Sequence, residues 1–268
     1  MSEKRGSCCI APRIGSSDKT DCRCPKIMTD SWRMIDYSSK DPAMNLATDE
    51  AILRSVLENN GPNTLRLWQN PPAVIIGHFQ DPKSVTSIVD CEELGIRIFR
   101  RVSGGGAVYH DYGNVNYSII VRKPSLAVGV ENVERSYSFF CGGVVEGLGM
   151  LSVQARNNGG NIVVEGKKIS GSAQHRLYDA ILHHGTLMVN VDFSTLGRAL
   201  KIQNPHATLV NLSEILESIT MKKTKNAIRK GYEKTCRVNL KTGSLTPNEI
   251  RTATILYQTK YIDRDWNG

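Results

Sequence analysis

The sequence predicts an α+β protein in which helices pack on a mixed or antiparallel sheet. Three observations favour this class: apolar residues recur at helical spacing in segments far apart, short strand-like runs lie between them, and glycine, proline or asparagine ends most runs. Apolar residues make up 40% of the chain and charged residues 22%, as in ordinary globular proteins. A chain of 268 residues can bury a full core. We therefore expect a tail over residues 1–31 and one domain over residues 32–268.

The first helix is expected to start at Asp41-Pro42, because proline is tolerated in the first turn of a helix. Apolar residues then follow at helical spacing, and the sequence Asn-Asn-Gly-Pro over 59–62 ends the pattern. The residues of this stripe are Leu46, Leu53, Val56 and Leu57.

Strands are expected next, because short runs either alternate or are continuously apolar. A run of three glycines, residues 104–106, interrupts them. The expected strands cover 64–68, 73–77, 96–102, 107–109 and 115–121.

The clearest helix covers 134–148, where one apolar stripe is followed by Gly149 as a natural C-terminal cap. The stripe consists of Tyr137, Phe140, Cys141, Val144 and Leu148. We expect Cys141 to be buried there as a small apolar residue.

A hairpin is expected beyond this helix, with strands over 162–164 and 168–170 and Glu165-Gly166 as its turn. Another strand is expected over 180–190. The last part reads as helical, because residues 246–249 form a capping box with proline at the first helical position.

The formal net charge of +8 is compatible with scattered surface charge, with nucleic acid or with a smaller anionic partner. No zinc finger, RNP motif or helix-turn-helix is present, so we expect no nucleic acid. No apolar run approaches the roughly 20 residues that cross a bilayer, so we expect no membrane segment. The N-terminus lacks the apolar core of a signal peptide and contains acidic residues, which favours a cytoplasmic location.

Four cysteines lie close together near the N-terminus: Cys8, Cys9, Cys22 and Cys24. Their spacing does not match the usual C-x2-4-C pattern of zinc sites. We interpret them as part of a disordered, reduced tail.

The segment RRVSGGGAVYHD, residues 100–111, carries the strongest chemical signal. Three consecutive glycines cost backbone entropy on folding, and a simple hairpin turn would need only two. A bare backbone lets amide groups approach an anion, with Arg101 as a fixed positive charge. We therefore expect a ligand-binding loop, although the segment matches neither a Walker A motif nor a dinucleotide fingerprint.

Two later segments add polar groups. Lys167 and Lys168 follow the hairpin turn, and small residues come after them, so a lysine here could neutralise charge on a phosphate or a carboxylate. His183 and His184 stand side by side on a strand, so one of them can reach a cleft.

Together these segments resemble the lipoate–protein ligase family. RRVSGGGAVYHD followed by GNVNYS is similar to the family signature, and GKKISGSAQ and HHGTLMVN resemble its second and third motifs. NLATDEAIL and NPPAVIIGHFQDP resemble its opening helix and first sheet segment. The resemblance covers about residue 32 to the end and implies the catalytic domain that biotin and lipoate ligases share.

The resemblance implies that lipoate and ATP react to lipoyl-adenylate, and that the lipoyl group then passes to a lysine of a lipoyl domain. Lys168 would be the catalytic lysine, touching both the acid and the nucleotide. ATP would lie against Arg101, Gly106, Ala107, Val108, Tyr109 and Lys168. Lipoate would lie against Ser103, Gly104, Gly105, Lys168, Gly171, Ser172, Ala173, His184 and Gly185. The aliphatic chain could occupy a slot formed by Val74, Ile75, Ile76 and Gly77.

Mg²⁺ would screen the leaving pyrophosphate. Asn161 stands where the family usually has an aspartate, which leaves the metal ligands unknown and puts adenylation in question. The expected protein substrates are lipoyl domains of 2-oxoacid dehydrogenases or the glycine cleavage H protein. The chain resembles the large subunit of an archaeal-type split ligase, whose C-terminal accessory domain would be a separate small subunit. The sequence leaves lipoate and octanoate both open.

Two alternatives stay open. An octanoyl- or lipoyltransferase of the same fold would take the acyl group from a carrier protein without ATP, but such enzymes use a cysteine. No cysteine lies between Cys141 and Cys236, which argues against this reading. A non-catalytic relative that binds a lipoyl group, a nucleotide or nucleic acid is the other alternative.

Overall fold

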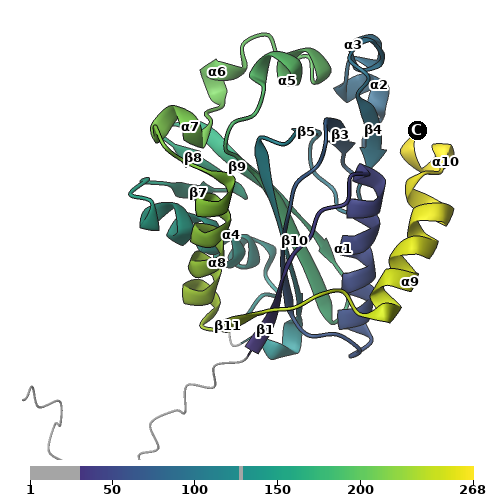
Figure 1. Cartoon of the computed structure of the whole chain (residues 1–268), viewed down its shortest axis with the longest axis vertical. Helices are drawn as coiled ribbons and strands as arrows, with labels where there is room; N and C mark the ends of the chain where they lie inside the picture. The colour runs from purple at the N-terminus through teal and green to yellow at the C-terminus, as the bar shows by residue number, and fades with distance from the viewer. Residues whose placement is uncertain (1–30, 127–128) are drawn as a thin grey trace, which may run out of the picture.

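The computed structural model describes residues 31–126 and 129–268. They form a large sheet between two pairs of helices, with a small sheet above one end of it (Figure 1). The expected α+β class with a mixed sheet is confirmed. The four N-terminal cysteines and most of the expected tail lie outside the described residues, but Ser31, which we assigned to the tail, is the first residue of a strand.

The large sheet has eight strands in the order β11-β1-β2-β6-β10-β9-β8-β7. β1 pairs in parallel with both β2 and β11, and the remaining pairs are antiparallel. The strands are β1 (Ser31–Asp36), β2 (Thr64–Trp68), β6 (Asn114–Arg122), β7 (Arg156–Asn158), β8 (Asn161–Val164), β9 (Lys167–Arg176), β10 (Ala180–Met188) and β11 (Asn239–Thr242).

The small sheet contains β3 (Ala73–Ile76) between β4 (Arg97–Arg100) and β5 (Val108–His110). β3 is parallel to β4 and antiparallel to β5. The triple-glycine loop joins β4 to β5 and therefore lies at the end of this sheet, beside the large one.

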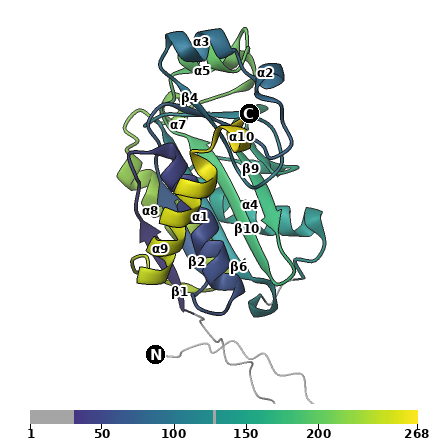
Figure 2. The same cartoon turned by 90° about the vertical axis from the view of Figure 1, so that its right-hand side faces the viewer.

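Two helices cover each face of the large sheet (Figures 1 and 2). α4 (Val133–Met150) and α8 (Met221–Cys236) pack on one face, around Phe140, Val144 and Tyr232. α1 (Pro42–Leu57) and α9 (Pro247–Leu256) pack on the other. Shorter helices fill the connections: α2 (Pro82–Val85), α3 (Ile88–Glu93), the 3₁₀ turn Lys123–Ser125, α5 (Phe193–Ala199), α6 (Pro205–Thr208), α7 (Leu212–Ile215), the π turn Tyr257–Tyr261 and α10 (Arg264–Asn267).

Local signals in the sequence predicted the start of two helices and one hairpin turn correctly, whereas the strand expected over 168–170 extends to Arg176. Asp41 caps α1, the Thr246–Glu249 capping box opens α9, and Glu165 and Gly166 adopt the positive φ angles of a two-residue hairpin turn. The expected cap at Gly149 is wrong, because α4 continues to Met150 and Ser152 takes the left-handed conformation instead. Cys141 is fully buried, as expected.

Candidate active site

A cavity of about 130 Å³ lies between the two sheets, on the face of the large sheet that α1 covers. Its walls come from α1, β2, β3, the loop after β4, and strands β5, β6, β8, β9 and β10. The three motif segments, which are far apart in the sequence, meet here.

Most residues that the sequence singled out line this cavity. They are Arg101, Gly106, Ala107, Val108, Lys168, Gly171, Ser172, Ala173, His184 and Gly185. Four others do not form its wall. Ser103 is buried behind His184, Gly104 faces the exposed ring of Phe79, and Gly105 lies against Arg101. The Tyr109 side chain packs into the core on the opposite side of the small sheet, so only its backbone could meet a ligand there.

Lys168 reaches the cavity because β9 contains a bulge. Ile162 pairs with Ser170, but Val163 pairs with Lys168, so Ile169 is the extra residue. Ile169 packs into the apolar core and the Ser170 hydroxyl contacts that of Tyr117, which places both on the face under α4. Lys168 and Gly171 can therefore share the cavity face. In a regular strand, two residues three positions apart would point to opposite faces.

Gly171 makes room for the lysine. A Cβ atom at Gly171 would lie 2.7 Å from both Cε and Nζ of Lys168, so the ammonium group sits directly over the glycine. Asn161 pairs with Gly171 across the hairpin and also lines the cavity, with its Oδ1 3.4 Å from the same point. Asn161, where the resemblance led us to expect an aspartate, thus faces the cavity close to the lysine.

Arg101 holds the triple-glycine loop in shape. Its guanidinium donates to the carbonyl oxygens of Gly104 and Gly106, at 2.5 and 2.9 Å, and to the Ser103 hydroxyl at 3.0 Å. The loop also packs closely against Gly77. A Cβ atom at Gly77 would lie only 2.0 Å from the Gly105 carbonyl oxygen, so a glycine is needed there. Since the carbonyls of Gly104 and Gly106 turn toward Arg101, the loop forms a wall with a buried positive charge behind it.

The charges around the cavity favour the binding of an anion. Burial lowers the pKa of Arg101 to about 10, so the guanidinium stays charged at neutral pH. Burial, and then the charge of Arg101, lowers the pKa of Lys168. Within the described part of the chain, no Asp or Glu is among the residues that line the cavity. Two cations thus face a space without a neutralising carboxylate, where a phosphate or a carboxylate would bind favourably.

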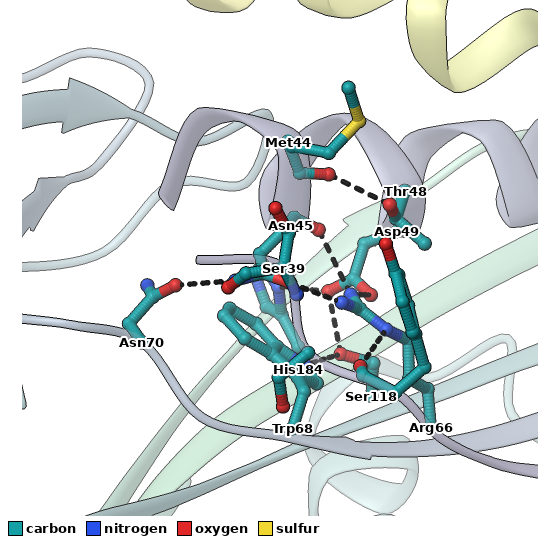
Figure 3. Close-up of polar contacts among 12 residues, drawn as sticks. Ser39, Met44, Asn45, Thr48, Asp49, Arg66, Trp68, Asn70, Ser118 and His184 are labelled. Atoms are coloured by element: carbon teal, nitrogen blue, oxygen red, sulfur yellow. Dashed lines mark hydrogen bonds and ion pairs between the residues drawn. The ribbon is translucent and has the colours of Figure 1, made fainter. Parts of the chain in front are cut away.

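Beside the cavity, a polar cluster connects α1 to the sheet (Figure 3). The Arg66 guanidinium is fully buried and donates to Asp49 at 2.6 Å and to Asn45 Oδ1 at 2.6 Å. The Ser118 hydroxyl donates to the other oxygen of Asp49, also at 2.6 Å. Burial raises the pKa of Asp49, but Arg66 and these hydrogen bonds outweigh it and hold the pKa below its usual value.

His184 links this cluster to the loop. Its Nδ1 lies 3.8 Å from Asp49 Oδ2 (Figure 3). Its Nε2 lies 2.6 Å from the Ser103 hydroxyl. Because Arg101 donates to Ser103 Oγ, the hydroxyl proton is free to point to Nε2, which leaves the proton of the ring on Nδ1, facing Asp49. Burial lowers the pKa of His184, so the ring is a neutral positioning group at physiological pH. His183 lies on the opposite face, among aromatic rings.

Sequence reasoning missed several residues of the wall: Leu46, Trp68, His110, Asn116 and Thr186. A signal for Asn116 was available, because the polar residues at 114, 116 and 118 alternate with apolar ones along a strand whose residues are nearly all buried. The expected apolar slot is only partly present. Ile75 lines the cavity, whereas Val74 and Ile76 point into another core cluster on the other face of β3.

Within the described part of the chain, no metal-binding cluster is present and no thiol lines the cavity. No group of three or more His, Cys, Asp or Glu side chains could hold a metal ion there. The nearest thiol is Cys141, whose Sγ lies 3.5 Å from Ser172 Oγ, behind the cavity wall. Cys141 is fully buried, and burial raises its pKa. No helix of the described residues is long and apolar enough to cross a membrane.

The model of the lipoyl protein ligase A/B catalytic domain matches residues 41–233. The chain belongs to this family. Octanoyltransferase LipM of Anoxybacillus flavithermus is 30% identical, covering 88% of this chain and 97% of its own, and that of Brevibacillus brevis is 29% identical, covering 89% and 99%. Membership makes the protein an enzyme of the lipoate ligase and transferase group.

Solved lipoate ligase structures are similar over most of the chain. Thermoplasma acidophilum protein Ta0514 with bound lipoic acid has a TM-score of 0.80 and 27% identity, covering 88% of this chain and 98% of its own. A bipartite lipoate protein ligase from the same organism, studied with its E2 lipoyl domain, has a TM-score of 0.81 and 26% identity, covering 89% and 96%. Lipoate-protein ligase A bound with ATP has a TM-score of 0.81 and 27% identity, covering 88% and 98%.

Proposed function

We propose that this protein is an ATP-dependent lipoate–protein ligase. One observation carries the proposal: within the described residues, the cavity presents the Lys168 ammonium and the buried Arg101 charge, but no thiol in its wall. A transferase that passes its acyl group through a cysteine needs a reactive thiol at the acid. Without one, the carboxylate has to be activated in another way, and two cations suit its reaction with a phosphate.

In the first step, a carboxylate oxygen of the acid attacks the α-phosphorus of ATP, and the bond to the bridging oxygen of pyrophosphate breaks. Two anions have to approach each other, so the step depends on positioning and on electrostatic stabilisation. Lys168 is suited to bridge both reacting groups, because its ammonium lies over Gly171, where no side chain interferes. Arg101 adds charge from behind the rigid loop and keeps the loop amides in place.

In the second step, the neutral amine of a substrate lysine attacks the acyl carbon of the mixed anhydride, and AMP leaves. The anhydride is already activated, so the enzyme has only to hold it and admit the amine. We expect the substrate lysine to belong to a lipoyl domain, because a similar ligase was studied with its E2 lipoyl domain. That ligase is bipartite, and we propose a separate accessory subunit for this chain as well.

Magnesium would enter with ATP as part of the nucleotide substrate. The cavity offers the neutral oxygen of Asn161 where the family usually has an aspartate, and magnesium prefers carboxylates and phosphates. The phosphates and water would therefore supply most of its ligands.

Octanoyl transfer from a carrier protein is the second candidate function, and the LipM relatives favour it. If this reaction used a thiol of the described residues near the cavity, Cys141 would be that thiol. Its burial and raised pKa oppose this role, because the thiolate is the nucleophile.

One experiment separates the two functions. The purified chain is incubated with a lipoyl domain and either lipoate, ATP and Mg²⁺ or an octanoyl carrier protein without ATP, and acylation is followed by intact mass. Each reaction is run with and without a candidate accessory subunit, and with Cys141→Ala beside the wild type. We expect acylation that requires ATP and survives Cys141→Ala. ATP-independent transfer from the carrier would overturn the ligase in favour of the transferase.

A further inference from the structure

Asn116 is a buried polar residue without a partner. Its side chain lines the cavity, the residue is 1% exposed, and neither its amide nitrogen nor its amide oxygen makes a hydrogen bond to any of the described residues. The polar residues on either side of it along β6 are satisfied: Asn114 donates to Thr186, and Ser118 donates to Asp49. A buried amide left unpaired is costly, so this one points to a group that a ligand supplies.

A row of paired residues connects Asn116 to Gly171 and Lys168 at the other end of the cavity. Trp68, Asn116, Thr186 and Gly171 are paired in sequence across β2, β6, β10 and β9, and form one row over the sheet. The Lys168 ammonium stands over Gly171 at one end of the row. Asn116 lies two strand spacings away, about 10 Å, a distance that an extended eight-carbon acid can span.

We infer that Asn116 selects the acid by its tail and favours a sulfur-bearing tail, as in lipoate, over a plain alkyl tail, as in octanoate. The inference rests on the proposed function, because it assumes that the carboxylate of the acid lies at Lys168. With the carboxylate there, the tail reaches Asn116, whose Nδ2 can donate to a sulfur atom, a weak acceptor. An octanoate tail offers no acceptor and leaves both amide atoms unpaired and shut off from water.

Asn116 both disfavours binding of the octanoate tail and favours binding of the lipoate tail. Trp68 and Leu46 offer the same apolar contacts to either chain, so they do not distinguish the two acids. The Asn116 amide, in contrast, responds to whether the tail carries a hydrogen-bond acceptor. One net hydrogen bond corresponds to a preference of roughly threefold to tenfold.

The test measures binding of lipoate and of octanoate to the full chain by titration calorimetry, without ATP. We expect wild type to bind lipoate roughly threefold to tenfold more tightly. Asn116→Leu should abolish this preference, mainly by strengthening octanoate binding. It should also raise the free energy of unfolding, since an unpaired buried amide is removed. Asn116→Ala, which cannot clash, is the second variant should leucine not fit.

Asn161→Ala is the matched control, because Asn161 lines the opposite end of the cavity, beside the carboxylate. It should weaken both acids alike and leave their ratio unchanged. Equal binding of both acids by wild type, or an unchanged ratio in the Asn116 variants, overturns the selection and leaves the ligase proposal intact. If neither acid binds to wild type, the acid site itself is overturned, and the proposed function with it.

Discussion

Two polar regions share one face of the large sheet, and they differ in how their charges are satisfied. In the cluster of Asp49, Arg66, Asn45 and Ser118, each charged group is paired within the protein. In the neighbouring cavity, Lys168, Arg101 and Asn116 face a space to which the described residues contribute neither a counter-charge nor a partner for the amide. A buried polar group is costly unless paired, so the first region contributes to stability and the second is ready for a ligand. Substitutions in the two regions should therefore affect different measurements.

The largest effect is expected from Lys168→Ala. Removing the ammonium leaves two approaching anions unneutralised, and we expect acid activation to fall by about 10²- to 10³-fold, as for loss of one preorganised electrostatic group. Pyrophosphate release measures the rate. Lys167→Ala is the control, because Lys167 precedes Lys168 in the strand but is exposed. Equal losses in both variants would show that position 168 has no special role.

The next effect is on stability and comes from Asp49→Ala. Arg66 is completely buried, so the substitution leaves a buried guanidinium without its carboxylate. We expect a loss of about 3–5 kcal/mol in the free energy of unfolding, measured by urea denaturation. Glu146→Ala removes an exposed partner of Lys234 and should change stability little. A small loss in the free energy of unfolding of the Asp49 variant would show that the cluster contributes little to stability.

Gly171→Ala should affect activity while leaving stability nearly unchanged. The added methyl group would lie 2.7 Å from the end of the Lys168 side chain, which is flexible enough to move aside. A displacement of about 1 Å can cost up to 10²-fold in rate, so we expect a loss of 10- to 100-fold in pyrophosphate release. At Gly149 a methyl group would meet no atom of the described residues within 4 Å, so Gly149→Ala is the control.

The smallest effect is a pH-dependent gain in stability in Lys168→Met. The folded protein lowers the pKa of Lys168, mainly by burial, so the charged lysine destabilises the fold. The penalty is present below the folded pKa and disappears as pH rises toward the unfolded value of 10.5. The variant should be more stable than wild type at neutral pH, with the difference closing at alkaline pH in urea titrations. A constant difference would exclude the charge as its cause.

The sequence alone predicts features that depend on neighbours in the chain. The Asp41 cap, the Glu165-Gly166 turn and the Thr246 capping box follow from local hydrogen bonding and backbone preference, and the structure confirms them. The glycine run and the small residues after Lys168 likewise indicated the loop and the strand that form the cavity.

Features that depend on distant pairing were not accessible in this way. β1 and β11 pair in parallel although about 200 residues separate them, and no local pattern specifies this. The bulge at Ile169 exists only relative to β8. The alternation along β6 could have indicated a polar face that includes Asn116, but its missing partners become visible only when β2, β6 and β10 lie side by side.

Because β9 contains a bulge, the Glu165-Gly166 turn helps to determine the direction in which the Lys168 side chain points. If β9 slid along β8 by one residue toward regular pairing, Val164 would face Lys168, and the ammonium would turn toward the apolar side under α4. The positive φ angles of Glu165 and Gly166 close the hairpin after two residues and oppose this slip. A solvent-facing turn outside the cavity wall thus helps to decide which of two adjacent lysines faces the cavity.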